Sequence, residues 1–97
     1  MSIILVPPAD AELQDAIDFY NDQMTGLGDR FYEAFTTTIS ILENNPTLWR
    51  RVGEHTRRVN LGRFPFFIMY VHEDSSIYIT CIAHHHRDPE YYINRQR

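Results

Sequence analysis

The sequence predicts an α+β domain in which a pair of helices packs on one face of a small sheet. Three observations predict it: a short strand-like segment at the start, two amphipathic helical patterns in the first half, and three strand-like segments in the second half. The chain has 97 residues, of which 43% are apolar, and this is enough for one core but too little for two. We therefore expect residues 1–97 to form a single domain.

The first half begins with a strand and continues with two helices. Residues 2–6 are rich in β-branched side chains and stop at two prolines, which indicates a strand. Residues 9–24 repeat apolar side chains at spacings of three and four, with aspartates opposite, and predict an amphipathic helix. After a glycine-containing breaker, Asp29 is expected to cap a second helix that ends before Pro46. Its predicted apolar stripe is Phe31, Ala34, Phe35, Thr38, Ile41 and Leu42.

The second half predicts a three-stranded meander and a short terminal helix. Residues 56–61 alternate, with Arg57, Val59 and Leu61 on one side and Arg58 and Asn60 on the other. Residues 64–71 are apolar at both parities, which is typical of a central strand. Residues 73–76 predict a turn and residues 77–83 the returning strand. Asp88 followed by Pro89 is then expected to begin a short helix.

The charges divide between the two halves of the chain. Residues 1–49 carry eight acidic residues and one Arg, whereas residues 50–97 carry eight Arg and five acidic residues. All nine cationic residues are Arg, and the guanidinium group suits carboxylates, phosphates and base edges. We therefore expect the two halves to meet different partners.

The sequence also indicates where the protein works. No apolar run is long enough to span a membrane, and the first residues do not have the pattern of a secretory signal. Cys81 is the single cysteine and excludes an internal disulfide, which fits a reducing cytosol. We expect a soluble cytoplasmic protein in which Cys81 is a small buried apolar residue.

A run of three histidines invites a metal interpretation. On a strand, His84 and His86 point to one side and His85 to the other, and His72 before the turn could lie near them across the hairpin. Imidazoles can hold Zn²⁺, but no carboxylate or thiolate accompanies them at a diagnostic spacing. We expect no metal and no other cofactor.

Several motifs together resemble one family. They are Leu27-Gly28 with Arg30-Phe31, Asn45-Pro46, Arg57-Arg58, Arg63-Phe64-Pro65-Phe66 leading to Tyr70, and the closing string from Ala83 through His84-His85-His86-Arg87-Asp88-Pro89 to Arg95. They are similar to the RelE/ParE toxin superfamily of bacterial type II toxin–antitoxin modules, in its ParE-like or plasmid-stabilisation branch. Tyr92 stands where many relatives have Trp.

The resemblance implies a RelE/ParE-like fold, a toxin function and a cognate antitoxin. Some members of the superfamily poison DNA gyrase, and others cleave messenger RNA on the ribosome. We expect the gyrase activity, exerted through protein–protein contacts. A RelE-like ribosome-dependent endonuclease is the alternative, and a non-toxic interaction module is a second one.

Five residues are the candidates for contact with the target: Arg58, Arg63, His84, Arg87 and Tyr92. The same five are the catalytic candidates if the chain is a nuclease, because RNA cleavage needs a base, an acid and a group that stabilises the phosphate. The absence of Lys and the net charge of −4 make ribosomal RNA a poor partner. For the antitoxin we expect the acidic outer face of the first helix, formed by Asp15, Asp18 and Asp22.

Structural roles compete with these assignments. An Arg-Asp pair could fix the terminal helix through Arg87 or Arg95, and Tyr91 and Tyr92 could close the core. The functional interpretation requires guanidinium groups on an uncovered side of the sheet, opposite the helices.

Overall fold

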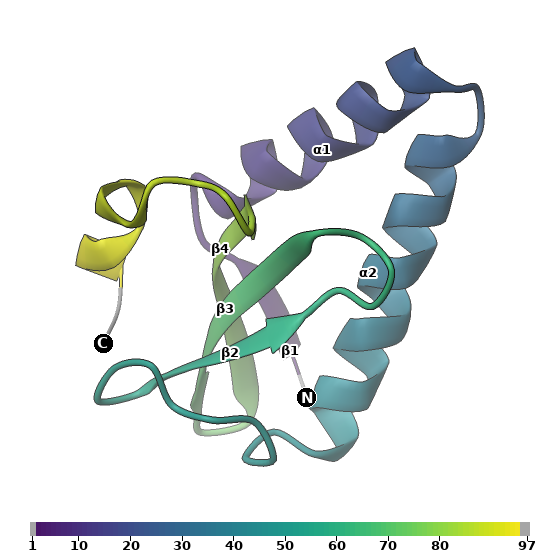
Figure 1. Ribbon diagram of the computed structural model, residues 1–97. Helices are drawn as coiled ribbons and strands as arrows, with labels where there is room; N and C mark the ends of the chain where they lie inside the picture. Colours follow the sequence, from purple (N-terminus) through teal and green to yellow (C-terminus); the bar gives the residue numbers. More distant parts are fainter. Residues whose placement is uncertain (1, 96–97) are drawn as a thin grey trace.

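The computed structural model describes residues 2–95 and confirms the predicted α+β class (Figure 1). The elements are β1 (Ser2–Leu5), α1 (Ala9–Gln23), α2 (Leu27–Asn44), β2 (Thr56–Asn60), β3 (Phe66–Glu73), β4 (Ser76–His84), and two 3-10 turns, η1 (Pro89–Tyr91) and η2 (Ile93–Arg95). In this part of the chain no helix combines the length and the apolar character that crossing a bilayer demands.

The four strands form one sheet in the order β1-β4-β3-β2. The strands β2, β3 and β4 make the predicted antiparallel meander. The first strand pairs in parallel with β4, so that Ser2 lies opposite Ser76 and Leu5 opposite Ile79. Phe67 through Val71 of β3 are buried on both faces between the two neighbouring strands, which accounts for their apolar character at both parities.

The two helices cover one face of the sheet and enclose the main core with it (Figure 1). The buried side chains of α2 recur every three or four residues at Phe31, Phe35, Ile39 and Leu42. The predicted stripe was therefore wrong at Ile41, which is 44% exposed and lines a groove beside the helix, and it omitted Ile39, which is buried. The first helix agrees more closely with the predicted amphipathic pattern, since Ala9, Leu13 and Ala16 on its inner side are buried.

The second helix begins at Leu27, so the predicted cap at Asp29 was wrong. Gly26 occupies the N-cap with a φ of 89°, in the left-handed region that glycine adopts without strain. The backbone N–H of Gly28 donates to Asn21 Oδ1 at 2.8 Å. A Cβ atom on Gly28 would collide with the carbonyl oxygen of Ile17. The missing side chain therefore allows α1 and α2 to approach closely.

The sheet face turned away from α1 and α2 is called the open face below, because neither of these helices packs on it. Other parts of the chain nevertheless cover some of it. Phe67, Met69, Cys81 and Ala83 form a second buried cluster on this face, and Val52 and Tyr92 pack against it. Figure 1 shows the C-terminal segment on the side of the sheet opposite α2. The expectation of an uncovered sheet face was therefore wrong, because four apolar side chains here are removed from water.

Glu12 of α1 ties the C-terminal segment to the sheet. Its Oε1 accepts a hydrogen bond from the backbone N–H of Ile82 at 3.0 Å, and its two oxygens accept from Arg95 Nη1 at 3.0 and 2.9 Å. The hydroxyl of Tyr91 donates to Oε2. Arg95 also donates to the carbonyl oxygen of Thr80 at 3.2 Å. Because β1 ends at Leu5, these side chains satisfy the edge of β4 where no strand pairs with it.

Residues 89–95 form two 3-10 turns instead of the predicted helix. Asp88 is the cap that the sequence predicts, since its Oδ1 accepts from the N–H of Glu90 at 3.0 Å. The predicted Arg-Asp pair does not form, because the carboxylate that pairs with Arg95 is Glu12. Tyr91 contacts Glu12 while Tyr92 contacts Phe67, so the segment is anchored on two sides.

Replacing Glu12 by Ala should lower the free energy of unfolding by about 3 kcal/mol, because the Arg95 guanidinium would stay in a poorly hydrated site without its partner. The two side chains are only 9% and 18% exposed. The control is Asp15→Ala on the exposed side of the same helix, which should change stability by less than about 0.5 kcal/mol. Urea unfolding followed by circular dichroism measures both, and equal losses would contradict the assignment.

Cys81 should react only when the chain unfolds. Burial, with a further effect from Glu12, raises the pKa of its thiol from 9.0 to about 12. The stability that comes from this shift is complete below pH 9 and is lost as the pH rises towards 12, because the unfolded chain ionises first. At pH 8.5 we expect a disulfide reagent to label the folded protein at least about 100-fold more slowly than the urea-unfolded chain. Similar rates would show that the open face is accessible.

Candidate functional site

Phe67 is the centre of a cluster of cationic and aromatic side chains on the open face. The guanidinium carbon of Arg58 lies 3.8 Å from its ring centroid. The ring of Tyr92 meets it edge-on at 5.1 Å, and the imidazole of His85 stacks on it at 6.1 Å. These contacts fix the Arg58 guanidinium by its face and leave its N–H groups at the rim.

The alternation of β2 decides which arginine reaches the open face. Arg57 turns to the opposite side, where its Nη1 donates to the carbonyl oxygen of Trp49 at 2.6 Å. Val59 on the same side belongs to the main core. The predicted division of Arg57 and Arg58 between the two faces is therefore confirmed.

Arg87 lies at the edge of the C-terminal segment. Its guanidinium stacks over the ring of Tyr91 at 3.7 Å. It lines a recess of about 340 Å³ between α1 and the end of β4, together with Phe19, His84 and Asp15. The side chain is exposed, so it is available to a partner.

His84 lies on the helix-facing side of the sheet. Its ring packs edge-on against Phe66 at 5.4 Å, and its Nδ1 accepts a hydrogen bond from the N–H of His86 at 3.0 Å. This side is opposite to that of His85, as the alternation predicts. His72 pairs with Ile77 at the other end of the hairpin, so its expected proximity to the histidine run was wrong. Within residues 2–95 no group of three or more His, Cys, Asp or Glu side chains is placed to hold a metal.

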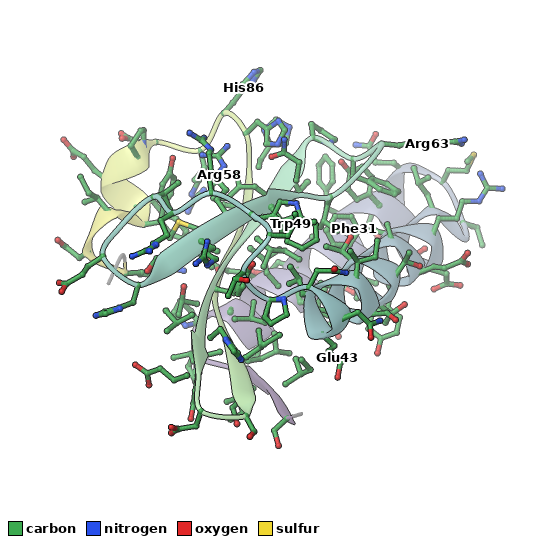
Figure 2. The ribbon with its side chains drawn as sticks, turned by 90° about the horizontal axis from the view of Figure 1, so that it is seen from below. Phe31, Glu43, Trp49, Arg58, Arg63 and His86 are labelled. Carbon is green, nitrogen blue, oxygen red and sulfur yellow. The ribbon has the colours of Figure 1, made fainter. Side chains whose placement is uncertain are left out.

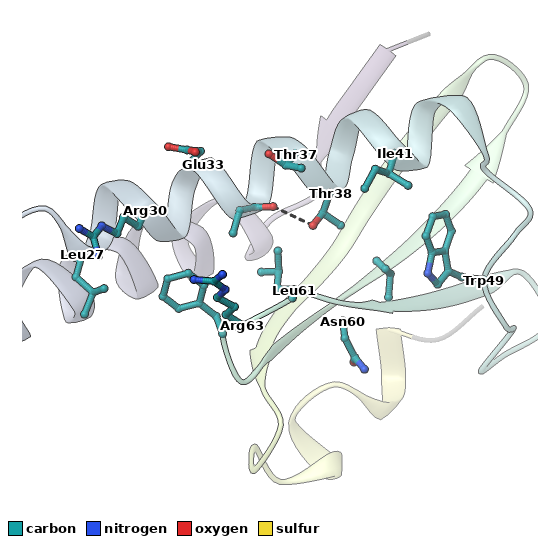
Figure 3. A pocket seen from close by; sticks show the side chains of 14 residues that line it. Leu27, Arg30, Glu33, Thr37, Thr38, Ile41, Trp49, Asn60, Leu61 and Arg63 are labelled. Carbon is teal, nitrogen blue, oxygen red and sulfur yellow. Dashed lines mark hydrogen bonds between the residues drawn. The ribbon is translucent and has the colours of Figure 1, made fainter.

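Arg63 lies in the loop between β2 and β3, at one end of a groove of about 900 Å³. Figure 3 shows Arg30, Thr37 and Ile41 of α2 on one side of this groove. Trp49 and Leu61 line it from the other side. The middle of the groove is mostly apolar, and the arginines Arg30 and Arg63 lie at the same end.

The five predicted target residues do not form one pocket. Arg58 and Tyr92 share the open face, His84 is on the helix-facing side, and Figure 2 shows Arg63 well apart from Arg58. Arg63, His84 and Arg87 nevertheless lie around one end of the sheet. The β2–β3 loop and the end of β4 meet there, since the N–H of His85 donates to the carbonyl oxygen of Pro65 at 2.8 Å.

The predicted acidic face of α1 is exposed at Asp15, Asp18 and Asp22. Asp18 accepts a hydrogen bond from Gln14 Nε2 at 2.9 Å within the same helix. Asp15 lines the recess that also holds Arg87. The three carboxylates form no ion pair within residues 2–95.

Sequence reasoning missed two residues near the site. Glu12 was not singled out, although it stands three residues after Ala9 and four before Ala16, within the buried stripe. A carboxylate within a buried stripe needs an internal partner, so the position of Glu12 in the helical pattern could have identified it as a paired residue. Arg50 lies beside Arg58, because its carbonyl oxygen accepts from the Arg58 N–H at 3.2 Å. Nothing local in the sequence indicates that pairing.

Comparisons with known proteins agree with this architecture. The family model for the ParE toxin of the type II toxin–antitoxin system parDE matches residues 3–89. A chain of the solved structure described as the chromosomal ParDE TA system from P. aeruginosa is similar in fold, with a TM-score of 0.74 and 20% sequence identity. That alignment covers 87% of this chain and 95% of the other. No curated protein matches the sequence significantly. Because the family model spans most of the chain, from β1 to the start of η1, the protein belongs to the ParE toxin family of type II toxin–antitoxin systems.

Proposed function

We propose that this ParE-family toxin inhibits DNA gyrase through protein–protein contacts and that a cognate antitoxin neutralises it. The observation that carries the proposal is a set of exposed or half-exposed arginines, Arg58, Arg63 and Arg87, none of which pairs with a carboxylate within residues 2–95.

The target surface consists of Arg58, Arg63, His84, Arg87 and Tyr92. The register that sets Phe66 opposite His84 brings the β2–β3 loop, which carries Arg63, close to the end of β4. Arg58 and Tyr92 lie apart from these, on Phe67 of the open face. Arg58, Arg63 and Arg87 form no ion pair with a carboxylate within residues 2–95. Unpaired guanidinium groups beside aromatic rings are typical of protein interfaces and favour an acidic partner surface.

The geometry supports binding over RNA cleavage. A metal-independent nuclease must bring a base, an acid and a cation to one phosphate. Here His84 lies on the helix-facing side, whereas Arg58 and Tyr92 lie on the open face. The sheet separates these three groups. Arg87 lines one recess with His84, but Arg58 and Tyr92 do not line it, so the five candidates do not converge on one phosphate.

The antitoxin is proposed to wrap the helix hairpin. The exposed carboxylates Asp15, Asp18 and Asp22 offer it a charge-complementary surface on α1. On the other helix, the groove between α2 and the β2–β3 loop can receive the apolar face of an amphipathic segment. Arg63 lines this groove, and Arg87 shares a recess with Asp15, so the antitoxin would also cover part of the target surface.

Purified toxin should block the supercoiling of relaxed plasmid by purified gyrase. Arg58→Ala should weaken this inhibition at least about tenfold, which corresponds to the loss of about 1.4 kcal/mol of binding. Arg51→Ala is the matched control, because Arg51 is the exposed neighbour of the site and donates to the carbonyl oxygen of Glu54. Failure to inhibit at large molar excess, together with new messenger ends that disappear in a His84→Ala variant, would favour the ribonuclease alternative. Normal growth on induction without antitoxin would favour a non-toxic interaction module.

Neutralising the acidic face should weaken the antitoxin complex. We expect the triple variant Asp15→Asn, Asp18→Asn and Asp22→Asn to bind the antitoxin encoded beside the toxin about tenfold less tightly and to release it faster at low salt. A variant with Glu73→Gln and Asp74→Asn removes acidic charge at the distant β3–β4 turn and serves as the control. Surface plasmon resonance at two salt concentrations measures both, and an unchanged off-rate in the triple variant would refute the electrostatic contribution.

A further inference from the structure

A second pocket lies at the outer edge of β2 and has a different character from the groove beside α2. Its volume is about 690 Å³, and its lining includes Leu48, Trp49, Arg50, Arg58, Asn60 and His85. It is called the edge pocket below. Its lining includes Arg58 and His85 from the Phe67 cluster, but Arg50 and Leu48 come from the connection between α2 and β2.

The backbone explains why the two arginines lie side by side. The segment before β2 folds back along its outer edge, so that the N–H of Arg58 donates to the carbonyl oxygen of Arg50 at 3.2 Å. The N–H of Val52 donates to the carbonyl oxygen of Thr56 at 2.8 Å in the same short pairing. The pairing ends at Arg50, and the edge pocket opens beyond it, next to Asn60.

The positive charges of the edge pocket are not neutralised by any acidic side chain in its lining. Two guanidinium groups and an imidazole line it, and none of its lining residues is acidic. Among residues 2–95, the arginine that pairs with a carboxylate is Arg95, on Glu12. The face of the Arg58 guanidinium rests on Phe67, which orients its N–H groups without using them.

Apolar side chains lie directly beside these charges. Leu48 is 70% exposed, the largest exposure among the large apolar side chains of residues 2–95. Trp49 is half-buried, lines the pocket and packs against the main core. Exposed leucine and tryptophan next to arginine form the composition of a protein-binding anchor site.

The overall charge favours a protein segment over a nucleic acid. Affinity for RNA grows with the number of phosphates that a protein neutralises, but this chain has a net charge of −4 and an acidic helix hairpin. The edge pocket offers two guanidinium groups in one place, which match two carboxylates of a short segment.

We propose that the edge pocket binds an acidic segment of the toxin's protein target, with Arg50 and Arg58 pairing with its carboxylates and an apolar side chain of the segment packing on Leu48 and Trp49. The proposal rests on the function proposed above and adds Arg50, Trp49 and Leu48 to the target surface. Arg50 is the sharpest test residue, because it is exposed and its side chain has no partner within the described residues.

The test compares Arg50→Glu with Arg51→Glu, a neighbouring exposed arginine that does not line the edge pocket. Both variants change the net charge equally, and thermal unfolding should show both folded. In the supercoiling assay we expect Arg50→Glu to need at least about tenfold more toxin for half inhibition, and Arg51→Glu to remain within about twofold of the parent. If the parent inhibits gyrase and Arg50→Glu inhibits it equally well, the edge-pocket proposal is overturned while the proposed function stands. If the parent does not inhibit gyrase, the proposed function fails, and the second assay then tests whether the edge pocket binds an acidic segment.

The second assay uses Trp49, the single tryptophan of the chain, as a reporter inside the pocket. The probes are a capped synthetic peptide with glutamates on both sides of a Leu-Phe pair and an oligouridylate RNA of about ten nucleotides. We expect the peptide to change Trp49 emission in a saturable way in the parent and in Arg51→Glu, but not in Arg50→Glu. Tighter binding of the RNA, or a peptide response that persists in Arg50→Glu, would overturn the proposal.

Discussion

The carboxylate of Glu12 joins three parts of the chain that are distant in sequence. It accepts a backbone hydrogen bond from β4, a hydroxyl hydrogen bond from Tyr91 and the guanidinium of Arg95. Through these contacts α1 holds the C-terminal segment against the sheet, and that segment in turn places Tyr92 on Phe67. Tyr92 and Arg58 both contact the ring of Phe67 on the open face. The packing of that face therefore depends on Glu12, a residue of the helical layer on the other side of the sheet.

This arrangement separates the two charge populations of the protein. Asp15, Asp18 and Asp22 of α1 are exposed on the helical side, while Arg58 and Arg87 rest on aromatic rings around the sheet. Each ring fixes the face of a guanidinium group and leaves its polar edge free, so the cations are positioned without internal ion pairs. A molecule built in this way can present unlike surfaces to two partners even though its net charge is small.

The sequence predicted those features that depend on local pattern. The two helices, the meander and the central position of β3 follow from hydrophobic periodicity, and the Asp88 cap follows from its position before Pro89. The family resemblance, carried mostly by the closing motif, is confirmed by the match over residues 3–89. The start of α2 was misplaced because Gly26 and the close packing of Gly28 on α1, and not the side chain of Asp29, determine it.

The parts that could not be predicted are contacts between distant residues. The parallel pairing of β1 with β4, the Glu12–Arg95 pair and the Arg50–Arg58 neighbourhood join positions that no local pattern relates. The placement of His72 failed for the same reason, since the length of the hairpin puts it at the far end from His84. The sequence could indicate which arginine, histidine and tyrosine residues were candidates for the site. It could not show that they are divided between two faces of the sheet, because that division depends on the tertiary fold.

The pairing of the first strand with the last has a consequence for biosynthesis. Ser2 leaves the ribosome early, but its partner Ser76 and the Arg95 that pairs with Glu12 belong to the stretch of this domain that is made last. While that stretch is still inside the exit tunnel, the helices have no completed sheet to cover, and long-range pairing of this kind is slow to form. The nascent polypeptide is thus without its finished surface until residue 95 has left the exit tunnel, so the surface that a partner would recognise is completed only after the rest of the domain has been made.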